Sequence, residues 1–134
     1  MNIENIHTPT AIAVSSMKAN ALRMKVIANN IANANCTSKN GQPYRRRDVV
    51  TSSRNDELTG ISLADVVDDK SSQFRPVYEP GHPHANEEGY VLYPNVEVPK
   101  ELTQMMLASR HYQASVAIMK QNQTVSQSAL ELLK

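Results

Sequence analysis

The chain has few of the residues that build a large hydrophobic core or a covalently braced one. Its 134 residues include no tryptophan, one phenylalanine and one cysteine. Large aromatic side chains dominate the stability of ordinary cores, so their scarcity argues against a conventional globular domain. A single cysteine excludes a disulfide within the chain.

Features that would mark several other protein classes are also missing. No apolar run approaches the roughly 18 residues that cross a bilayer, and no apolar segment with a small-residue cleavage site indicates a secretory signal. Fourteen basic and thirteen acidic side chains give a formal net charge of +1, so nucleic acid and anionic membranes are not expected partners. We therefore expect a protein that is not membrane-inserted, and that stays in the cytoplasm or leaves it without a cleaved signal.

Glycine is confined to the middle of the chain, and proline is nearly so. All four glycines lie within 41–89, and the stretches 10–35 and 100–134 contain neither glycine nor proline. Because both residues interrupt helices, their distribution divides the chain into three segments. These are an N-terminal helical arm, a small β or loop domain and a C-terminal helical arm, over 1–35, 36–94 and 95–134.

The first arm has helical periodicity. Thr8 can cap a helix with Pro9 at its first position, and we expect a helix over 9–34, about 39 Å long. Its apolar stripe follows alternating steps of three and four residues. The stripe consists of Val14, Met17, Ala21, Met24, Ala28 and Ile31.

The last arm repeats this pattern more strictly. We expect a helix over about 97–133, roughly 55 Å long. Strict three-four spacing over five heptads is the period of a coiled coil rather than of a globular helix. The predicted seam consists of Val98, Leu102, Met105, Ser109, Tyr112, Val116, Met119, Gln123, Ser126, Leu130 and Leu133.

The middle segment favours short strands. It holds five of the six aromatic residues, and turn signals such as Pro80-Gly81 separate its apolar runs. The predicted fold is mainly α, with long N- and C-terminal helices in a coiled-coil-like pair and a small, irregular, β-rich middle element. The β-leaning runs lie at 47–51, 61–67, 73–78 and 90–93.

The polar faces of both arms are unusual because they carry amides instead of charges. The stretch ANNIANAN at 28–35 contains four asparagines, and between Leu102 and Leu130 only Arg110 and Lys120 are charged. Solvated coiled coils normally carry Glu and Lys on their flanks. Neutral amides suit a face covered by protein, where an unpaired charge is costly and an amide can still find hydrogen bonds.

These faces predict that other copies of the chain enclose the helices. A soluble helical-hairpin adaptor, with its amides facing water, is the alternative. The predicted subunit interface consists of Val14, Met17, Ala21, Met24, Ala28, Asn29, Asn30, Ile31, Asn33, Val98, Leu102, Met105, Tyr112, Val116, Met119, Leu130 and Leu133.

No residue pattern indicates catalysis, a metal or a cofactor. His82 and His84 form an H-x-H pair beside two glutamates, but the pair falls on a turn and its spacing is not that of a zinc site. Cys36 is interpreted as an incidental thiol, because nothing marks a base held beside it. The arginine run 45–47 is followed closely by acidic residues, which favours a solvated or partner-facing patch.

Four stretches of the sequence resemble one family, in order and over about the whole chain. RMKVIANNIANANCTS (23–38) resembles the signature of the flagellar rod, hook and filament-type axial proteins. GQPYRRRDVV (41–50), YEPGHPHANEEGYVLYPNVEV (78–98) and ASRHYQASVAIMKQNQTVSQSALELL (108–133) resemble the short basal-body rod proteins of the FlgC family. Cys36 departs from the usual threonine or acidic residue.

The resemblance implies a subunit of the proximal rod that spans the periplasm and transmits torque. It implies that the terminal helices form the inner layer of a helical tube, with the middle domain outside. It also implies export through the flagellar type III apparatus without signal cleavage. The implied partners are further copies, other proximal and distal rod subunits and basal-body ring or adaptor proteins; another short rod subunit is the alternative identity.

Overall fold

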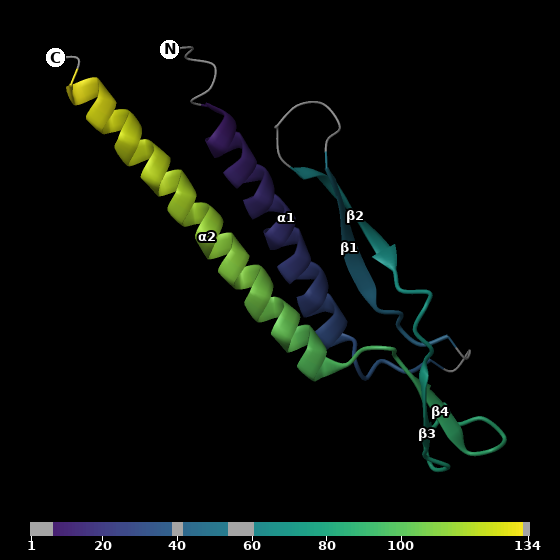
Figure 1. Cartoon of the computed structure of the whole chain (residues 1–134). Coiled ribbons are helices and arrows are strands. Elements are labelled where there is room, and N and C mark those ends of the chain that lie inside the picture. Colours follow the sequence, from purple (N-terminus) through teal and green to yellow (C-terminus); the bar gives the residue numbers. More distant parts are fainter. Residues whose placement is uncertain (1–6, 39–41, 54–60, 133–134) are drawn as a thin grey trace.

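Two long helices and four short strands make up the structure. The computed structural model describes residues 7–38, 42–53 and 61–132. The two helices lie side by side, and a small antiparallel β region lies beside α1 and beyond one end of the pair (Figure 1), which confirms the predicted fold class. In chain order the elements are α1 (His7–Ala32), β1 (Arg47–Ser53), β2 (Ile61–Asp68), β3 (Arg75–Tyr78), β4 (Tyr90–Tyr93) and α2 (Val98–Glu131).

The helices form an antiparallel pair whose outer ends lie at the same end of the molecule (Figure 1). α1 begins two residues before its predicted start, so Thr8 lies in the first turn and does not cap the helix. Pro9 also lies in that turn, where a missing N–H costs nothing. Pro99 occupies the first turn of α2 in the same way.

The seam between the helices has the predicted period, but alternate positions are shifted by one residue. α2 buries Glu101, Ala108 and Ser115 at steps of seven, whereas the predicted Leu102 is 50% exposed. Ala108 and Ser115 have small side chains, which let the helix backbones approach each other. The Ser115 hydroxyl donates a hydrogen bond to Ser16 Oγ across the seam at 3.0 Å.

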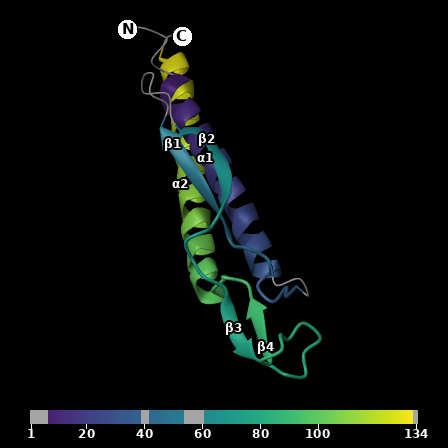
Figure 2. The ribbon, with the colours of Figure 1, turned by 90° about the vertical axis from the view of Figure 1, so that its right-hand side faces the viewer.

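The strands form two separate antiparallel hairpins. Each of the four predicted β runs coincides with one strand to within two residues at either end. β1 pairs with β2, with Arg47 opposite Asp68 and a register irregularity after Val50. β3 pairs with β4, with Arg75 opposite Tyr93. The β1–β2 hairpin lies along α1, and the β3–β4 hairpin extends beyond the end of the helical pair (Figure 2).

Gly89 is required by the loop that joins β3 to β4. Its φ of +82° lies in the left-handed region, which side chains other than glycine rarely adopt. A Cβ at this position would also lie 2.9 Å from Tyr78 Cε2. The backbone of the β3–β4 hairpin therefore requires glycine at position 89.

The core is thin and made largely of small residues. No aromatic side chain is fully buried among the described residues, and the largest core hydrophobic side chain is that of isoleucine. The chain exposes 10,046 Å² of surface, whereas a compact monomer of this mass would expose roughly 7,000 Å². The buried hydrophobic residues are Ala13, Ala19, Ile27, Ala34, Val49, Val91, Val96 and Ala108.

Candidate functional site

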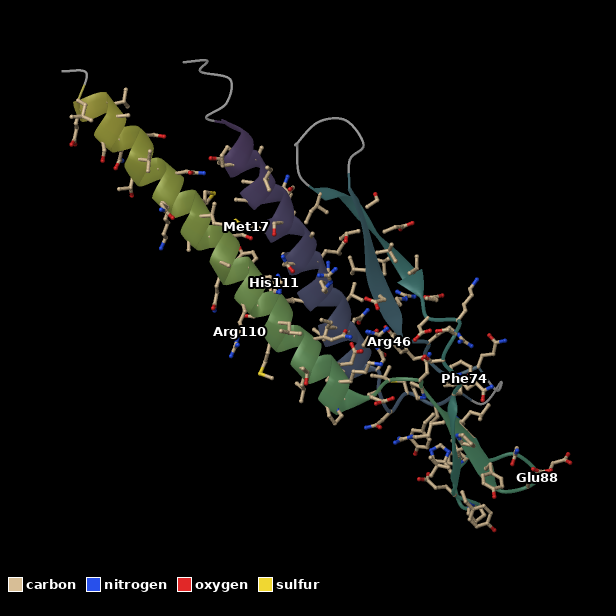
Figure 3. The ribbon with its side chains drawn as sticks, in the orientation of Figure 1. Met17, Arg46, Phe74, Glu88, Arg110 and His111 are labelled. Atoms are coloured by element: carbon tan, nitrogen blue, oxygen red, sulfur yellow. The ribbon has the colours of Figure 1, made fainter. Side chains whose placement is uncertain are left out.

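A buried cluster of polar side chains joins the helical pair to the β region. We call Asn30, Arg46 and Glu101 the polar junction. Their exposed fractions are 0%, 8% and 0%. Asn30 comes from the last turns of α1, Arg46 directly precedes β1, and Glu101 lies in the first turn of α2, so three segments far apart in the sequence meet here. Figure 3 labels Arg46 near the start of β1.

Both carboxylate oxygens of Glu101 accept hydrogen bonds inside the junction. Arg46 Nε donates to Oε1 at 2.7 Å, and Asn30 Nδ2 donates to Oε2 at 2.9 Å. The other guanidinium nitrogens donate to Asp48 Oδ2 and to Gln104 Oε1, each at 3.1 Å. A charge buried this deeply is tolerated only when it is paired and fully hydrogen-bonded.

The amide of Asn30 fixes the path of the chain into β1. Its Oδ1 accepts hydrogen bonds from the Tyr44 hydroxyl at 2.8 Å and from the backbone N–H of Arg47 at 3.0 Å. Its Nδ2 also donates to the Arg47 carbonyl at 2.8 Å. Asn30 was predicted to be buried by another copy of the chain, but its own chain buries it completely.

Arg46 stays charged in this setting. Burial alone would lower its pKa, but the hydrogen bond and the charge of Glu101, reinforced by Asp48, outweigh burial and raise the pKa above its usual value. The junction is therefore an ion pair held in a protein interior. Removing Arg46 would leave the buried Glu101 carboxylate without its cation, which is far more costly than losing a surface ion pair.

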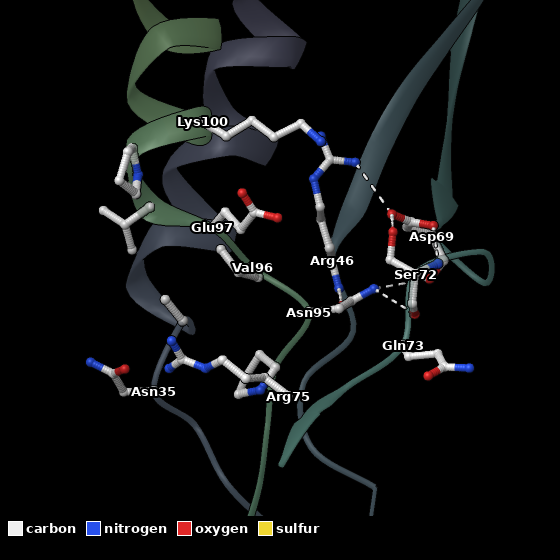
Figure 4. Close-up of a pocket in the computed structure, with 14 residues that line it drawn as sticks. Asn35, Arg46, Asp69, Ser72, Gln73, Arg75, Asn95, Val96, Glu97 and Lys100 are labelled. Atoms are coloured by element: carbon white, nitrogen blue, oxygen red, sulfur yellow. Dashed lines mark hydrogen bonds and ion pairs between the residues drawn. The ribbon is translucent and has the colours of Figure 1, made fainter. Parts of the chain in front are cut away.

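A second set of bonds ties the loop after β2 to the junction. The side chain of Asn95 accepts a hydrogen bond from Arg46 N at 2.7 Å and donates to the carbonyls of Asp69 and Ser72 at 3.2 and 3.3 Å (Figure 4). Asp69 accepts from the hydroxyls of Ser71 and Ser72 at 2.6 and 2.8 Å. These two side-chain bonds hold the pKa of Asp69 well below its usual range.

Asp69 should make the stability of the chain sensitive to acid. Because its pKa is lower in the folded chain, its contribution is complete above the unfolded pKa of about 3.9 and declines as the pH falls toward the folded value. We expect Asp69→Asn to flatten the loss of unfolding free energy below about pH 4, measured by urea titration at several pH values. Asp65→Asn, at an exposed strand position, is the control; equal pH profiles for the two variants would contradict the assignment.

A cavity of about 560 Å³ opens beside the junction. Arg46, Asp69 and Asn95 form one wall (Figure 4), and all three are bonded to one another or to the adjacent loop. Prolines and valines before and at the start of α2 supply apolar lining. The charged residues that also line the cavity are Arg75, Glu97 and Lys100. The side chains of Arg46, Asp69 and Asn95 are thus engaged in holding the fold.

The histidine pair lies in the turns between β3 and β4. The Thr37 hydroxyl and His84 Nδ1 share a hydrogen bond of 2.8 Å, and His82 Nδ1 accepts one from the His84 backbone N–H at 3.0 Å. Over the described ranges, no three His, Cys, Asp or Glu side chains gather as metal ligands would. Both rings have structural contacts that explain their position.

The arginine run has three separate structural roles. Arg45 stacks over the Phe74 ring at 4.3 Å, Arg46 belongs to the polar junction, and Arg47 pairs with Asp68 at 3.3 Å on the exposed strands. The run was predicted to be a solvated or partner-facing patch, which is wrong for its buried central member. The exposed Cys36 has its Sγ 3.5 Å from an asparagine oxygen.

The residues of the predicted subunit interface fall into distinct environments. The following residues line an open apolar groove between the helices, of about 290 Å³: Val14, Met17, Ala21, Tyr112 and Met119. The half-buried members elsewhere are Met24, Ile31, Asn33, Met105 and Val116. The exposed members are Ala28, Asn29, Val98, Leu102 and Leu130. Asn30 is in the polar junction, and Leu133 lies outside the described residues.

Sequence reasoning did not find the two charged members of the junction. Arg46 was hidden within an arginine run, and Glu101 looked like an ordinary acidic residue in the first turn of a helix. One signal was present: Glu101 lies seven residues before Ala108 and fourteen before Ser115, in register with the line of α2 that is buried. A charge on that line requires a partner of opposite sign.

None of the helices in the described part of the chain is long and apolar enough to span a bilayer.

The sequence matches two family models. One, described as flagella basal body rod protein, covers residues 11–38. The other, described as flagellar basal body rod FlgEFG protein C-terminal, covers residues 87–132. The matched segments include most of α1, the β4 strand and all of α2.

Curated relatives share most of the chain. Flagellar basal-body rod protein FlgC of Yersinia enterocolitica is 38% identical over 125 residues, which cover 90% of this chain and 92% of the relative. The protein of the same name from Salmonella typhimurium is 39% identical, covering 81% and 83%. That of Bacillus subtilis is 32% identical, covering 92% and 95%. With this identity over almost the full length of its relatives, the chain belongs to the FlgC family of flagellar basal-body rod proteins.

Proposed function

We propose that the chain is a non-enzymatic structural subunit of the flagellar basal-body rod, which assembles by packing its paired helices against neighbouring subunits. Its family membership supports the rod assignment. The observation that carries the packing mechanism is the surface of α2, where six large hydrophobic side chains between Leu102 and Leu130 are 49–66% exposed. Apolar surface of this kind is stabilised when neighbours cover it.

The detailed architecture follows from the same surface. Subunits with different contacting faces join by heterologous contacts, which propagate as a helix instead of closing within a pair. Asn122 Nδ2 is buried without a hydrogen-bond acceptor among the described residues. This supports the proposal that neighbouring subunits pack along α2. A helical shaft enclosed in this way resists twisting and can carry torque.

The proposed location is the proximal rod, which spans the periplasm. We propose that the type III apparatus exports the subunits without signal cleavage. Partners are further copies of the chain, the other proximal and distal rod subunits and the ring or adaptor proteins that surround the rod. The proposed role is mechanical, and no residue is assigned a catalytic role.

A strain that lacks the chain tests the proposal. We expect it not to swim, and an epitope-tagged copy should restore swimming and purify with detergent-extracted basal bodies. Immunoblotting of the basal-body fraction and electron microscopy of rods are the measurements. Swimming without the chain, together with recovery of a soluble monomer or dimer of fixed stoichiometry, would instead support the hairpin-adaptor alternative.

A further inference from the structure

The β3–β4 hairpin has one face that packs on the chain and one face that is uncovered. Side chains alternate between the two faces of a strand, so the neighbours of the buried Val91 point away from it. All four side chains on the uncovered face are exposed and uncharged. We call this face the hairpin patch; it consists of the cross-strand pairs Pro76 with Leu92 and Tyr78 with Tyr90.

The hairpin patch is rigid as well as exposed. Tyr78 and Tyr90 are 63% and 43% exposed, and their rings meet edge to face with centroids 5.3 Å apart. Asn86 Oδ1 fixes the adjoining loop, because it accepts hydrogen bonds from the backbone N–H groups of Glu88 and Tyr90 at 3.1 and 2.8 Å. Rigid aromatic side chains lose little entropy on binding and often anchor protein interfaces. Such a face, where polar side chains normally meet water, indicates a binding surface.

The loop beside the hairpin patch is acidic. From Pro76 to Leu92 the hairpin has three glutamates and neither lysine nor arginine. Glu87 and Glu88 make no ion pair with any other described residue, and Glu88 lies at the tip of the hairpin, away from the helices (Figure 3). The complementary partner therefore combines small or apolar side chains with unpaired cations.

α1 presents a surface of this kind. Its sequence contains Lys18, Arg23 and Lys25 but no acidic residue, and none of the three cations pairs with a described carboxylate. α2 and the β1–β2 hairpin pack on other sides of the helix. Two of the cations lie on its exposed side, among small residues at steps of three and four. We call this side the lysine face; it consists of Lys18, Ala21, Lys25, Ala28 and Ala32.

The hairpin patch and the lysine face agree in size. Lys18 and Lys25 are two turns apart, about 10 Å along α1, and the small side chain of Ala21 lies between them. The hairpin patch extends over two residue steps of each strand, or about 7 Å. It therefore fits on Ala21 between the two lysines. In that position the lysine stems cover the tyrosine rings, whose faces attract the ammonium groups.

One chain cannot make this contact with itself. The hairpin projects beyond the end of the helical pair (Figure 1, Figure 2), and β3 and β4 contact no other helix or strand in the described part of the chain. Lys18 lies about 21 Å back along α1 from its end at Ala32. The opposite charges of the two surfaces can therefore meet only between copies displaced along the helical axis.

We infer that the hairpin patch of one copy docks on the lysine face of a second copy. This inference rests on the proposed function and names two surfaces that meet in the rod. Because the two surfaces differ, the contact is heterologous: a copy that receives a hairpin still offers its own. Burial of the aromatic rings stabilises the contact, and the charges select its partner.

Disulfide cross-linking tests the inference. In a Cys36→Ser background, Leu92→Cys in the hairpin patch is combined with Ala21→Cys in the lysine face. The matched control combines Leu92→Cys with Ala114→Cys, at an exposed alanine of α2, and each single-cysteine variant shows whether a position links to itself. Swimming cells are oxidised, basal bodies are isolated, and the linked cysteines are identified by mass spectrometry after non-reducing electrophoresis.

We expect a link between positions 21 and 92 of different copies, and no link between positions 92 and 114. Basal bodies that contain the chain without the first link, or in which position 92 joins only a different protein, would overturn the docking and leave the rod function intact. Absence of the chain from the basal bodies of swimming cells would instead overturn the proposed function.

Charge reversal provides the test if the cysteine variants do not assemble. Lys18→Glu with Lys25→Glu should cause loss of most swimming, because like charges then face each other across the contact. Adding Glu87→Lys with Glu88→Lys should restore swimming. The control is Lys120→Glu at an exposed position of α2, whose effect on swimming the hairpin changes should not correct. Undiminished swimming of the α1 variant, or failure of the hairpin changes to rescue it, also overturns the docking.

Discussion

Replacing Arg46 with methionine is expected to lower the free energy of unfolding by about 3–5 kcal/mol. Methionine keeps most of the packing volume but leaves the fully buried carboxylate of Glu101 without its cation. A loss of this size is a large part of the total stability of a domain, which is about 5–15 kcal/mol. Urea unfolding of the purified chain, followed by circular dichroism, measures the change.

Two further variants show whether the buried charge is the cause. Arg47→Met removes an exposed ion pair with Asp68, whose side chains are each 49% exposed, and should cost at most about 1 kcal/mol. The double variant Arg46→Met with Glu101→Gln removes both charges and keeps an acceptor for Asn30, so it should recover much of the lost stability. Equal losses for Arg46→Met and Arg47→Met would contradict the role of the polar junction.

Replacing Met119 with aspartate is expected to abolish rod assembly and swimming. Met119 is half-buried and lines the apolar groove, so the substitution places an unpaired charge on the helical surface that we propose packs against a neighbouring subunit. Desolvating that charge costs on the order of several kcal/mol, and the cost recurs at every copy in the assembly. Swimming in soft agar and counts of rods in electron micrographs are the measurements.

Gln73→Asp is the control for the added charge. Gln73 is exposed on the loop between β2 and β3, away from the helical groove, so this variant should swim. Circular dichroism of both purified variants shows whether the helices survive the substitution. Swimming by the Met119→Asp strain would refute the assignment of the groove as an assembly surface.

The secondary structure was predictable because local signals agree with one another. The stretches without glycine and proline form most of α1 and α2, and each β-leaning run between turn signals overlaps a strand. The period of α2 was also readable, because heptad spacing constrains which residues share a face. The seam prediction chose Leu102 over Glu101 because it ranked positions by hydrophobicity alone.

The polar junction was not predictable, since its partners are separated along the chain. Glu101 and Asn30 are 71 residues apart, and Glu101 and Arg46 are 55 residues apart. Only the folded chain brings them together, and each looks ordinary among its sequence neighbours. The asparagine-rich stretch was correctly singled out as unusual, but Asn30 owes its burial to its own chain. The role of the remaining asparagines in contacts between copies stays a prediction.

The residues of the polar junction are far apart in the sequence. This separation decides when the junction can form in a chain that leaves a narrow passage one residue at a time. If the N-terminus emerges first, Asn30 and Arg46 are outside early but cannot form the junction until Glu101 follows. If the C-terminus emerges first, Glu101 must wait for Asn30. In either direction the polar junction cannot form until most of the polypeptide has emerged, so a chain in such a passage would stay threadable until then.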